Sequence, residues 1–192
     1  MQPAAPPLDK KALRREMVAR RDALDPAERA RLGAILMERV LALPQLARAR
    51  SALTTMAIGS ELDTAPLMAY LRAEGKTLVL PRVGPPPRRL EIYAVEDPSR
   101  DLVPGVWDIP EPDPSRCRKL ELSEVDFALV PALAIDARRY RLGYGAGYFD
   151  GLLAGRGASP FCVTALPAMF HVERLPAEAH DVPVDLVLSE RD

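Results

Sequence analysis

A run of almost uninterrupted apolar residues, Val125 to Ile135, constrains the fold more than any other stretch of this sequence. Asp126 is the only charged residue within it. Successive side chains of a strand point to opposite faces, so a strand of this composition must be buried on both faces. The run therefore predicts a central strand of a sheet that is covered on both sides. Pro131 is expected to mark the end of that strand or a bend in it.

The segment before this run has the pattern of a strand–helix–strand unit. The elements we expect are a strand, a turn, a helix and a second strand, over residues 51–58, 59–64, 65–73 and 77–80. Such a unit has parallel strands and a right-handed crossover. Ligands in parallel sheets bind at the carboxyl ends of the strands. Glu61 and Arg82, each just past a strand, are therefore candidate ligand contacts, with exposed loop charges as the alternative.

Two helices are expected before the sheet. Asp9 can cap one that runs to about Leu24, and Asp25 followed by Pro26 can start a second one. We expect further strands at residues 90–95, 161–166 and 185–189. The predicted fold class is α/β: a single domain with a mostly parallel, Rossmann-like sheet flanked by helices and preceded by two N-terminal helices. We place that domain at residues 8–192, after a flexible tail of residues 1–7.

The composition favours a protein whose partners are small molecules. The 192 residues carry 26 basic and 27 acidic side chains, which gives no electrostatic case for a nucleic-acid or membrane partner. No apolar run approaches the ~20 residues of a membrane span. Cys117 and Cys162 lie far apart and outside any metal-ligand spacing, which favours reduced thiols in a cytoplasmic protein. We expect a monomer.

The glycine-rich run Arg141 to Asp150 is the strongest candidate for a binding site. Three alternating glycines allow the backbone to turn several N–H groups toward one anion. The alternative is a tight turn that needs positive φ angles. The run lacks the Gly-Lys-[Ser/Thr] end of a P-loop and the spacing of a dinucleotide fingerprint. We expect a short helix at residues 151–154 to follow it.

Other residues could serve the same anion. Lys10 and Arg14 stand on adjacent turns of one helix face and could reach it together, whereas Arg15, Arg20 and Arg21 are interpreted as a solvated face. Asp150 and Asp181 offer hard oxygen ligands of the kind that Mg²⁺ takes together with phosphate; Asp150 could instead favour a helix N-terminus. Trp107 could wall a flat ligand or cover the core.

These segments together resemble the 5-formyltetrahydrofolate cyclo-ligase family, also called the methenyltetrahydrofolate synthetases. The hallmark loop of that family, Arg-Leu-Gly-x-Gly-x-Gly-Tyr-[Tyr/Phe]-Asp, is present here as residues 141–150. Weaker matches follow the order of the family pattern at residues 10–14, 61–64, 75–82, 107–112 and 180–185. The resemblance spans residues 10–189, which is nearly the whole chain.

The resemblance implies ATP-dependent cyclisation of 5-formyltetrahydrofolate to 5,10-methenyltetrahydrofolate, with release of ADP and phosphate. It implies that Lys10 and Arg14 bind ATP phosphates, that Asp150 and Asp181 hold Mg²⁺, and that Glu61 binds the pterin ring. Met56 and Trp107 would wall the folate, and Tyr148 would sit between the two substrates. The nucleotide loop would consist of Arg141, Leu142, Gly143, Tyr144, Gly145, Ala146, Gly147, Tyr148 and Phe149.

The chain departs from the family pattern near its C-terminus. The family has an aromatic residue followed by Gln in a segment that reads Ala165-Leu166-Pro167-Ala168-Met169-Phe170 here. Two alternative functions therefore stay open. One is a paralogue that uses ATP with a different acceptor, and the other is a non-catalytic anion- or nucleotide-binding module.

Overall fold

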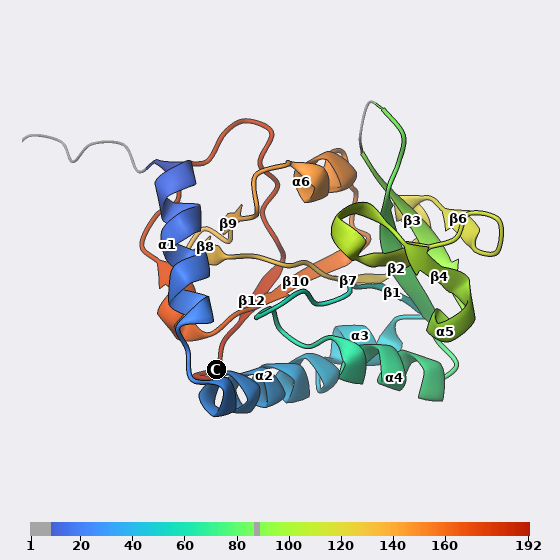
Figure 1. Ribbon diagram of the computed structural model, residues 1–192, viewed down its shortest axis with the longest axis horizontal. Helices are drawn as coiled ribbons and strands as arrows, with labels where there is room; N and C mark the ends of the chain where they lie inside the picture. The colour runs from blue at the N-terminus through green and yellow to red at the C-terminus, as the bar shows by residue number, and fades with distance from the viewer. Residues whose placement is uncertain (1–8, 87–88) are drawn as a thin grey trace, which may run out of the picture.

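The structure is a computed structural model that describes residues 9–86 and 89–192. The predicted flexible tail, residues 1–7, lies outside the described residues. A seven-stranded sheet forms the centre of the molecule, with the strand order β12-β10-β7-β1-β2-β3-β6 (Figure 1). The predicted α/β class with a mostly parallel sheet and two N-terminal helices is confirmed.

The parallel part of the sheet runs from β12 to β2. Its strands are β1 (Ser51–Leu53), β2 (Thr77–Val83), β7 (Phe127–Leu129), β10 (Phe161–Ala165) and β12 (Leu186–Leu188). Two strands continue the sheet in the antiparallel sense, β3 (Leu90–Val95) on β2 and β6 (Arg118–Leu120) on β3. The strand–helix–strand unit is confirmed, with Ser51 opposite Thr77 in parallel register.

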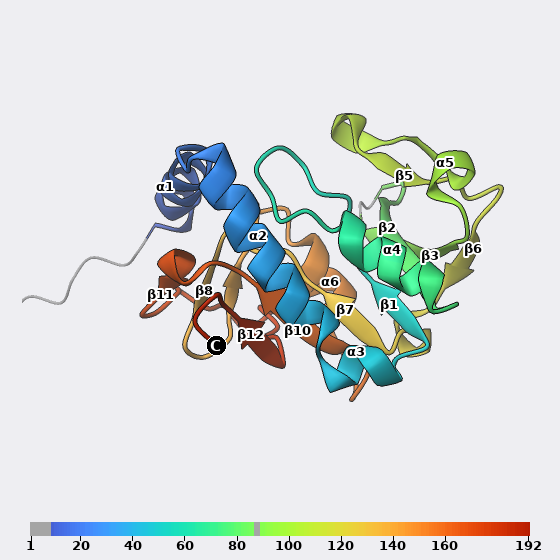
Figure 2. The ribbon, with the colours of Figure 1, turned by 90° about the horizontal axis from the view of Figure 1, so that it is seen from below.

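Helices cover both faces of this sheet. Figures 1 and 2 show α2, α3 and α4 along one face, and α1 and α6 on the other. Their bounds are α1 Lys10–Asp22, α2 Pro26–Leu41, α3 Pro44–Arg48, α4 Ala65–Ala73, α5 Pro98–Asp101 and α6 Tyr148–Leu153. Short 3₁₀ turns occupy Val106–Asp108, Leu122–Glu124 and Ala168–Phe170. Within the described part of the chain, no helix has the length and apolar character needed to cross a bilayer.

Two small sheets flank the central one. β8 (Ala134–Asp136) lies between β11 (His171–Val172) and β9 (Arg141–Leu142), and β4 (Leu102–Pro104) pairs with β5 (Pro110–Pro112). The first of these sheets carries the chain into the glycine run. The buried carboxylate of Asp136 accepts the N–H of Leu175 at 3.0 Å and that of Tyr140 at 3.1 Å. It thereby ties the turn before the glycine run to the C-terminal segment.

The long apolar run does not form one strand. β7 ends at Leu129 and β8, in another sheet, begins at Ala134, with Pro131 between them. The run is nevertheless buried as predicted, because Val130 and Leu133 pack in the core between the two strands. The expected end of the strand near Pro131 is therefore confirmed.

Two other predicted boundaries were wrong. The strand expected over residues 51–58 ends at Leu53, and the chain then leaves the sheet. The helix expected over residues 151–154 begins three residues earlier, at Tyr148, because Gly147 in a left-handed conformation reverses the chain there. The early end of β1 leaves the chain after Leu53 outside the sheet at its carboxyl edge.

The core consists of two apolar layers, one on each face of the sheet. Side chains alternate between them along each strand: Leu53 and Val79 face α1 and α6, whereas Leu78 and Leu80 face α2 and α4. The α1 layer holds Leu13 and Met17, both buried. Because these two residues anchor one face of α1, its polar face is held over the glycine run.

Candidate active site

One cavity of about 780 Å³ lies at the carboxyl edge of the sheet. Its walls come from the chain after β1, the end of β2, Pro131 after β7, the polar face of α1 and the glycine run. The residues that the family resemblance assigns to the site all line it: Lys10, Arg14, Met56, Glu61, Trp107, Arg141, Leu142, Gly143, Tyr144, Gly145, Ala146, Gly147, Tyr148, Phe149, Asp150 and Asp181. This edge is where parallel α/β sheets bind ligands.

The glycine run has the conformation expected of an anion loop. Gly145 and Gly147 have φ angles of 107° and 69°, which ordinary side chains rarely adopt. The N–H groups of residues 144–147 donate no hydrogen bond to any residue that the structure describes. Unpaired backbone donors that line a cavity form a binding site for a phosphate or a carboxylate.

Arg14 fixes the loop from the opposite side. Its Nε donates to the carbonyl oxygen of Gly143 at 2.9 Å, and its Cζ lies 3.1 Å from the position that a Cβ on Gly145 would take. A side chain at position 145 would therefore meet the guanidinium as well as an unfavourable φ angle. The close approach keeps a positive charge beside the loop N–H groups.

Lys10 is engaged with carboxylates at the rim. Its Nζ donates to Glu178 Oε1 at 2.8 Å and to Asp181 Oδ2 at 3.0 Å. Partial burial disfavours the ammonium, but these two hydrogen bonds outweigh it and raise the pKa of Lys10 above its ordinary value. Asp181 Oδ2 also accepts the N–H of Glu178 at 2.7 Å. Lys10 therefore neutralises part of the negative charge of Glu178 and Asp181 at the edge of the cavity.

Asp150 pairs with the first residue of the glycine run. Its Oδ1 accepts from Arg141 Nη2 at 2.9 Å and from the N–H of Val182 at 3.0 Å. The Arg141 side chain is only 3% exposed, and this burial lowers the pKa of its guanidinium. The pair joins α6 and β9 to the 180–185 segment, so it has a structural role that the sequence analysis did not anticipate.

Glu61 and several exposed apolar or aromatic side chains form another wall of the cavity. Glu61 Oε2 accepts the N–H of Ile58 at 3.0 Å, and its Oε1 accepts a hydrogen bond from Tyr144. Ile58, Trp107 and Tyr144 are large apolar or aromatic side chains that are exposed, and all three line this cavity. Trp107 is 68% exposed. Exposed aromatic surface beside a fixed carboxylate suits a planar ligand that carries N–H donors.

The charges around the cavity differ from expectation at two positions. Arg82 lies outside it and instead donates to the carbonyl oxygen of Pro112 at 2.9 Å. Arg21, interpreted from sequence as solvated, lines the cavity and donates to Ser60 Oγ at 2.8 Å. Its spacing could have identified it, because a residue seven positions after Arg14 lies on the same helix face.

Glu178 and His180 are further lining residues that the sequence did not reveal. His180 Nε2 is 3.8 Å from Glu178 Oε2 and from Asp181 Oδ1. The contact between Glu178 and Lys10 spans 168 residues of chain, which local periodicity does not encode.

A parallel sheet with a glycine-rich loop at its carboxyl edge is typical of α/β proteins that bind phosphate-bearing small molecules. The family model described as "5-formyltetrahydrofolate cyclo-ligase family" matches residues 7–190. The chain belongs to the 5-formyltetrahydrofolate cyclo-ligase family.

Curated relatives agree with this assignment. The 5-formyltetrahydrofolate cyclo-ligase of Escherichia coli K12 is 29% identical over 178 residues, which cover 88% of this chain and 94% of that protein. The mouse protein of the same name is 26% identical over 189 residues, covering 94% and 93%.

Solved structures have the same fold. The NMR structure of Aquifex aeolicus 5,10-methenyltetrahydrofolate synthetase superposes with a TM-score of 0.82 at 31% identity, covering 95% of this chain and 90% of that one. A 5,10-methenyltetrahydrofolate synthetase from Mycoplasma pneumoniae gives a TM-score of 0.77 at 20% identity, covering 95% and 99%, and supports the fold alone.

Proposed function

We propose that this protein is an ATP-dependent ligase that cyclises 5-formyltetrahydrofolate to 5,10-methenyltetrahydrofolate and releases ADP and phosphate. The observation that carries the proposal is that the phosphate-type loop and the carboxylate with its aromatic wall line one cavity. ATP and a flat folate ring can therefore meet within it. Family membership supports the same reaction.

The ATP end of the site is assigned to the glycine loop. The N–H groups of residues 144–147 have no acceptor among the described residues and could receive phosphate oxygens, and Arg14 lies against the loop. Lys10 would leave the carboxylates of Glu178 and Asp181 to contact phosphate when the nucleotide binds. Electrostatic neutralisation of this kind is the main requirement of phosphoryl transfer.

Asp150 and Asp181 fit a magnesium site that phosphate completes. Asp150 Oδ2 and Asp181 Oδ1 accept no hydrogen bond from the part of the chain that the structure describes. Within the same residues, no cluster of three or more His, Cys, Asp or Glu side chains is arranged to hold a metal ion. Mg²⁺ commonly takes one or two carboxylates together with nucleotide phosphates, and it would withdraw charge from the transferred group.

The folate end is assigned to Glu61, Met56 and Trp107. The carboxylate of Glu61 is held by Ile58 and Tyr144, so it is oriented before a ligand arrives. The amino and ring N–H groups of a pterin are donors that a carboxylate accepts. Tyr148, at the first position of α6, also lines the cavity and would sit between the two substrates.

The chemistry requires positioning rather than a protein nucleophile. The formyl oxygen on N5 attacks the γ-phosphorus of ATP and ADP leaves. The N10 lone pair then attacks the activated formyl carbon. The bond from that carbon to the phosphorylated oxygen breaks, phosphate departs, and N10 loses its proton. Holding the reacting atoms in line supplies most of the acceleration that such a site can give.

We also propose that the protein acts as a cytoplasmic monomer whose residues 8–192 form a single ATP- and folate-binding domain. Both cysteines are buried and unpaired, as expected in a reducing compartment. Burial raises the pKa of Cys162 to about 11, which suppresses its reactive thiolate.

A coupled assay distinguishes the proposed function from its alternatives. The protein is incubated with 5-formyltetrahydrofolate, ATP and Mg²⁺, and methenyl product is followed by its near-ultraviolet absorbance together with ADP. Equal amounts of the two products are expected. ATP binding without folate binding, measured by calorimetry, would indicate a paralogue with another acceptor. Binding of ATP with no turnover of any acceptor would indicate a non-catalytic module.

A further inference from the structure

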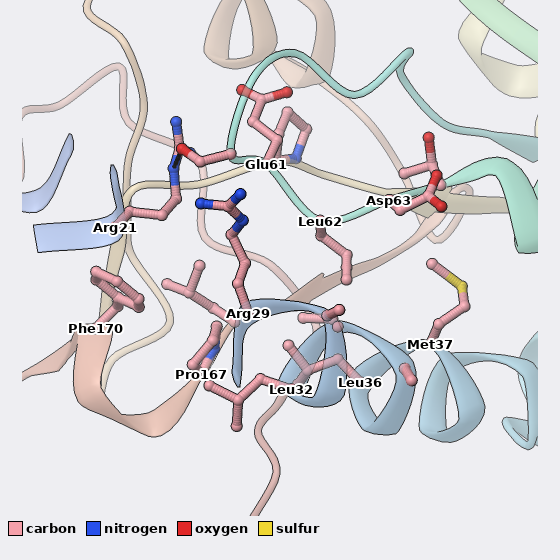
Figure 3. A pocket seen from close by; sticks show the side chains of 18 of the residues that line it. Arg21, Arg29, Leu32, Leu36, Met37, Glu61, Leu62, Asp63, Pro167 and Phe170 are labelled. Atoms are coloured by element: carbon pink, nitrogen blue, oxygen red, sulfur yellow. Dashed lines mark hydrogen bonds between the residues drawn. The ribbon is translucent and has the colours of Figure 1, made fainter. Parts of the chain in front are cut away.

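The hairpin formed by β4 and β5 carries the only tryptophan of the chain in its turn. It lies beside β2 (Figure 2), and Trp107, Ile109, Pro110 and Glu111 line the active-site cavity. A smaller cavity of about 450 Å³, drawn in Figure 3, is lined by no residue of this hairpin, the whole of which the structure describes. The hairpin therefore belongs to the active-site cavity alone.

The turn of this hairpin needs support from outside its own two strands. Trp107 is 68% exposed, and both Trp107 and Asp108 have positive φ angles, 58° and 59°, which residues other than glycine rarely adopt. The ladder below the turn pairs only three residues from each strand, and three of those six are prolines, which have no N–H to donate. A backbone of this kind persists only where surrounding contacts hold it.

The side chain of Glu111 supplies one such contact, on the side of the central sheet. Glu111 lies at the middle position of β5 and is 5% exposed. Its Oε1 accepts the N–H of Val83 at 3.3 Å, and its Oε2 lies 3.8 Å from Arg82 Nη1. Arg82 Nη1 also donates to the carbonyl oxygen of Pro112 at 2.9 Å. These contacts tie β5 to the end of β2, beyond Val79, where the pairing with β1 stops.

On its other side, the same side chain touches the turn. A Cβ on Gly105 would lie 2.4 Å from both Cγ and Cδ of Glu111, so only glycine allows this approach. The φ angle of Gly105, −111°, is ordinary, so the contact and not the conformation requires glycine here. The N–H of Gly105 closes the turn on the carbonyl oxygen of Ile109 at 2.9 Å. A displacement of Glu111 would therefore move the backbone two residues before Trp107.

We propose that Glu111 is a positioning residue for the folate: it holds the turn against β2 and so determines where the ring of Trp107 stands in the cavity. The inference rests on the proposed function, in which Trp107 walls the folate. The carboxylate of Glu111 lies beneath the turn and faces Val83 and Arg82. A buried carboxylate must be compensated by such contacts, so Glu111 acts through Trp107 and not by pairing with the ligand.

A double-mutant cycle on the full chain separates action through Trp107 from direct contact with the folate. Glu111→Ala removes the support and Trp107→Ala removes the wall. Each is expected to raise Kd and KM for 5-formyltetrahydrofolate about tenfold, with kcat and the Kd for ATP unchanged, because contact with an aromatic ring is lost. The combined variant should bind folate no more weakly than Trp107→Ala alone, since no ring is left to position. Additive losses would show that Glu111 contacts the folate itself and would overturn the inference.

Tryptophan fluorescence tests the position of the turn without any ligand, because Trp107 is the only tryptophan. Glu111→Ala should shift the emission of Trp107 and change its quenching by acrylamide. Gly105→Ala, which displaces the turn from the opposite side of the contact, should do the same. Glu111→Gln keeps the shape of the side chain and an oxygen for the N–H of Val83, so it should resemble the parent in emission and in folate binding. A direct ionic contact with the folate would instead be lost in Glu111→Gln as fully as in Glu111→Ala.

Glu91→Ala is the matched control. Glu91, on the neighbouring strand β3, pairs with Lys119 Nζ at 2.6 Å and lies outside the lining of the cavity. Its removal should alter neither the binding of folate nor the emission of Trp107. Thermal melts of every variant, together with the unchanged Kd for ATP, separate a binding effect from a folding effect.

The two measurements also separate failure of this inference from failure of the proposed function. If the parent chain binds folate and the cycle is non-additive, but no methenyl product forms, the inference holds and the proposed reaction does not. Failure of the parent chain to bind folate would overturn the proposed function, while the emission of Glu111→Ala would still show whether Glu111 holds the turn. A Glu111→Ala variant with unchanged emission, or with equal losses of ATP and folate affinity, would overturn the inference irrespective of turnover.

Discussion

The ion pair between Arg141 and Asp150 gives the sharpest stability prediction. The Arg141 side chain is 3% exposed, and Asp150, at 21%, accepts from it at 2.9 Å. Asp150→Ala would leave a buried guanidinium whose remaining hydrogen-bond partner among the described residues is the carbonyl oxygen of Val182. The substitution also removes the acceptor for the N–H of Val182. Both losses should lower the free energy of unfolding.

The size of the effect follows from the burial of the pair. Removal of one partner of a buried pair costs about 3–5 kcal/mol, and the partial exposure of Asp150 favours the lower end, about 3 kcal/mol. For a chain of this length, 1 kcal/mol shifts Tm by about 2–4 °C, so the expected decrease is about 6–12 °C. Asp150→Asn retains an acceptor oxygen and should cost about 1–2 kcal/mol.

Thermal unfolding followed by circular dichroism measures these changes. The companion variant is Asp150→Ala combined with Arg141→Met, which removes the unpaired charge while keeping an apolar stem. This double variant should melt at a higher temperature than Asp150→Ala alone, because a buried pair replaced on both sides leaves no uncompensated ion. A Tm of Asp150→Ala equal to that of the parent, or a double variant less stable than the single one, would refute the reasoning.

Three further predictions concern the loop, the folate wall and the pH dependence of stability. Gly145→Ala should abolish ATP binding measured by calorimetry, because of its φ of 107° and the approach of Arg14, whereas Gly143→Ala, with no neighbour within 4 Å, should retain it. Glu61→Gln should raise the KM for the folate about tenfold or more and leave the Kd for ATP unchanged; a parallel change in both would contradict the assignment. Burial raises the pKa of Cys162 from 9.0 to about 11, so its contribution to stability is present below pH 9 and is lost as the pH rises toward 11. Urea titrations should show a steeper loss over that range for the parent than for Cys162→Ala, and identical slopes would show that the thiol does not contribute.

The arrangement of helices and strands in layers was predictable, because the spacing of apolar residues and the residues that cap each element are local features of the sequence. The apolar run 125–135, the capping residues Asp9 and Asp25, and the alternation in β2 each identify an element from its own residues. The strand ends were less predictable. Residues 55–58 were expected to continue the strand, but they leave the sheet, and Thr55, Met56 and Ile58 border the cavity instead.

The site was predictable in its parts and not in its pairings. The glycine loop and the Lys10–Arg14 spacing are visible in sequence because each depends on short-range geometry. The contacts of Lys10 with Glu178, of Arg141 with Asp150 and Val182, and of Tyr144 with Glu61 depend on how distant segments pack. The position of Arg21 in the cavity was hidden for the same reason, since a basic residue on an amphipathic helix is usually solvated.

The most direct test of the central claim is the stoichiometry of the reaction. Purified protein is mixed with 5-formyltetrahydrofolate, ATP and Mg²⁺, and methenyl product and ADP are measured together over time. Formation of one methenyltetrahydrofolate for each ADP, with no ADP formed when the folate is omitted, is the predicted result. Well-folded protein that binds ATP yet forms no methenyl product would contradict the account.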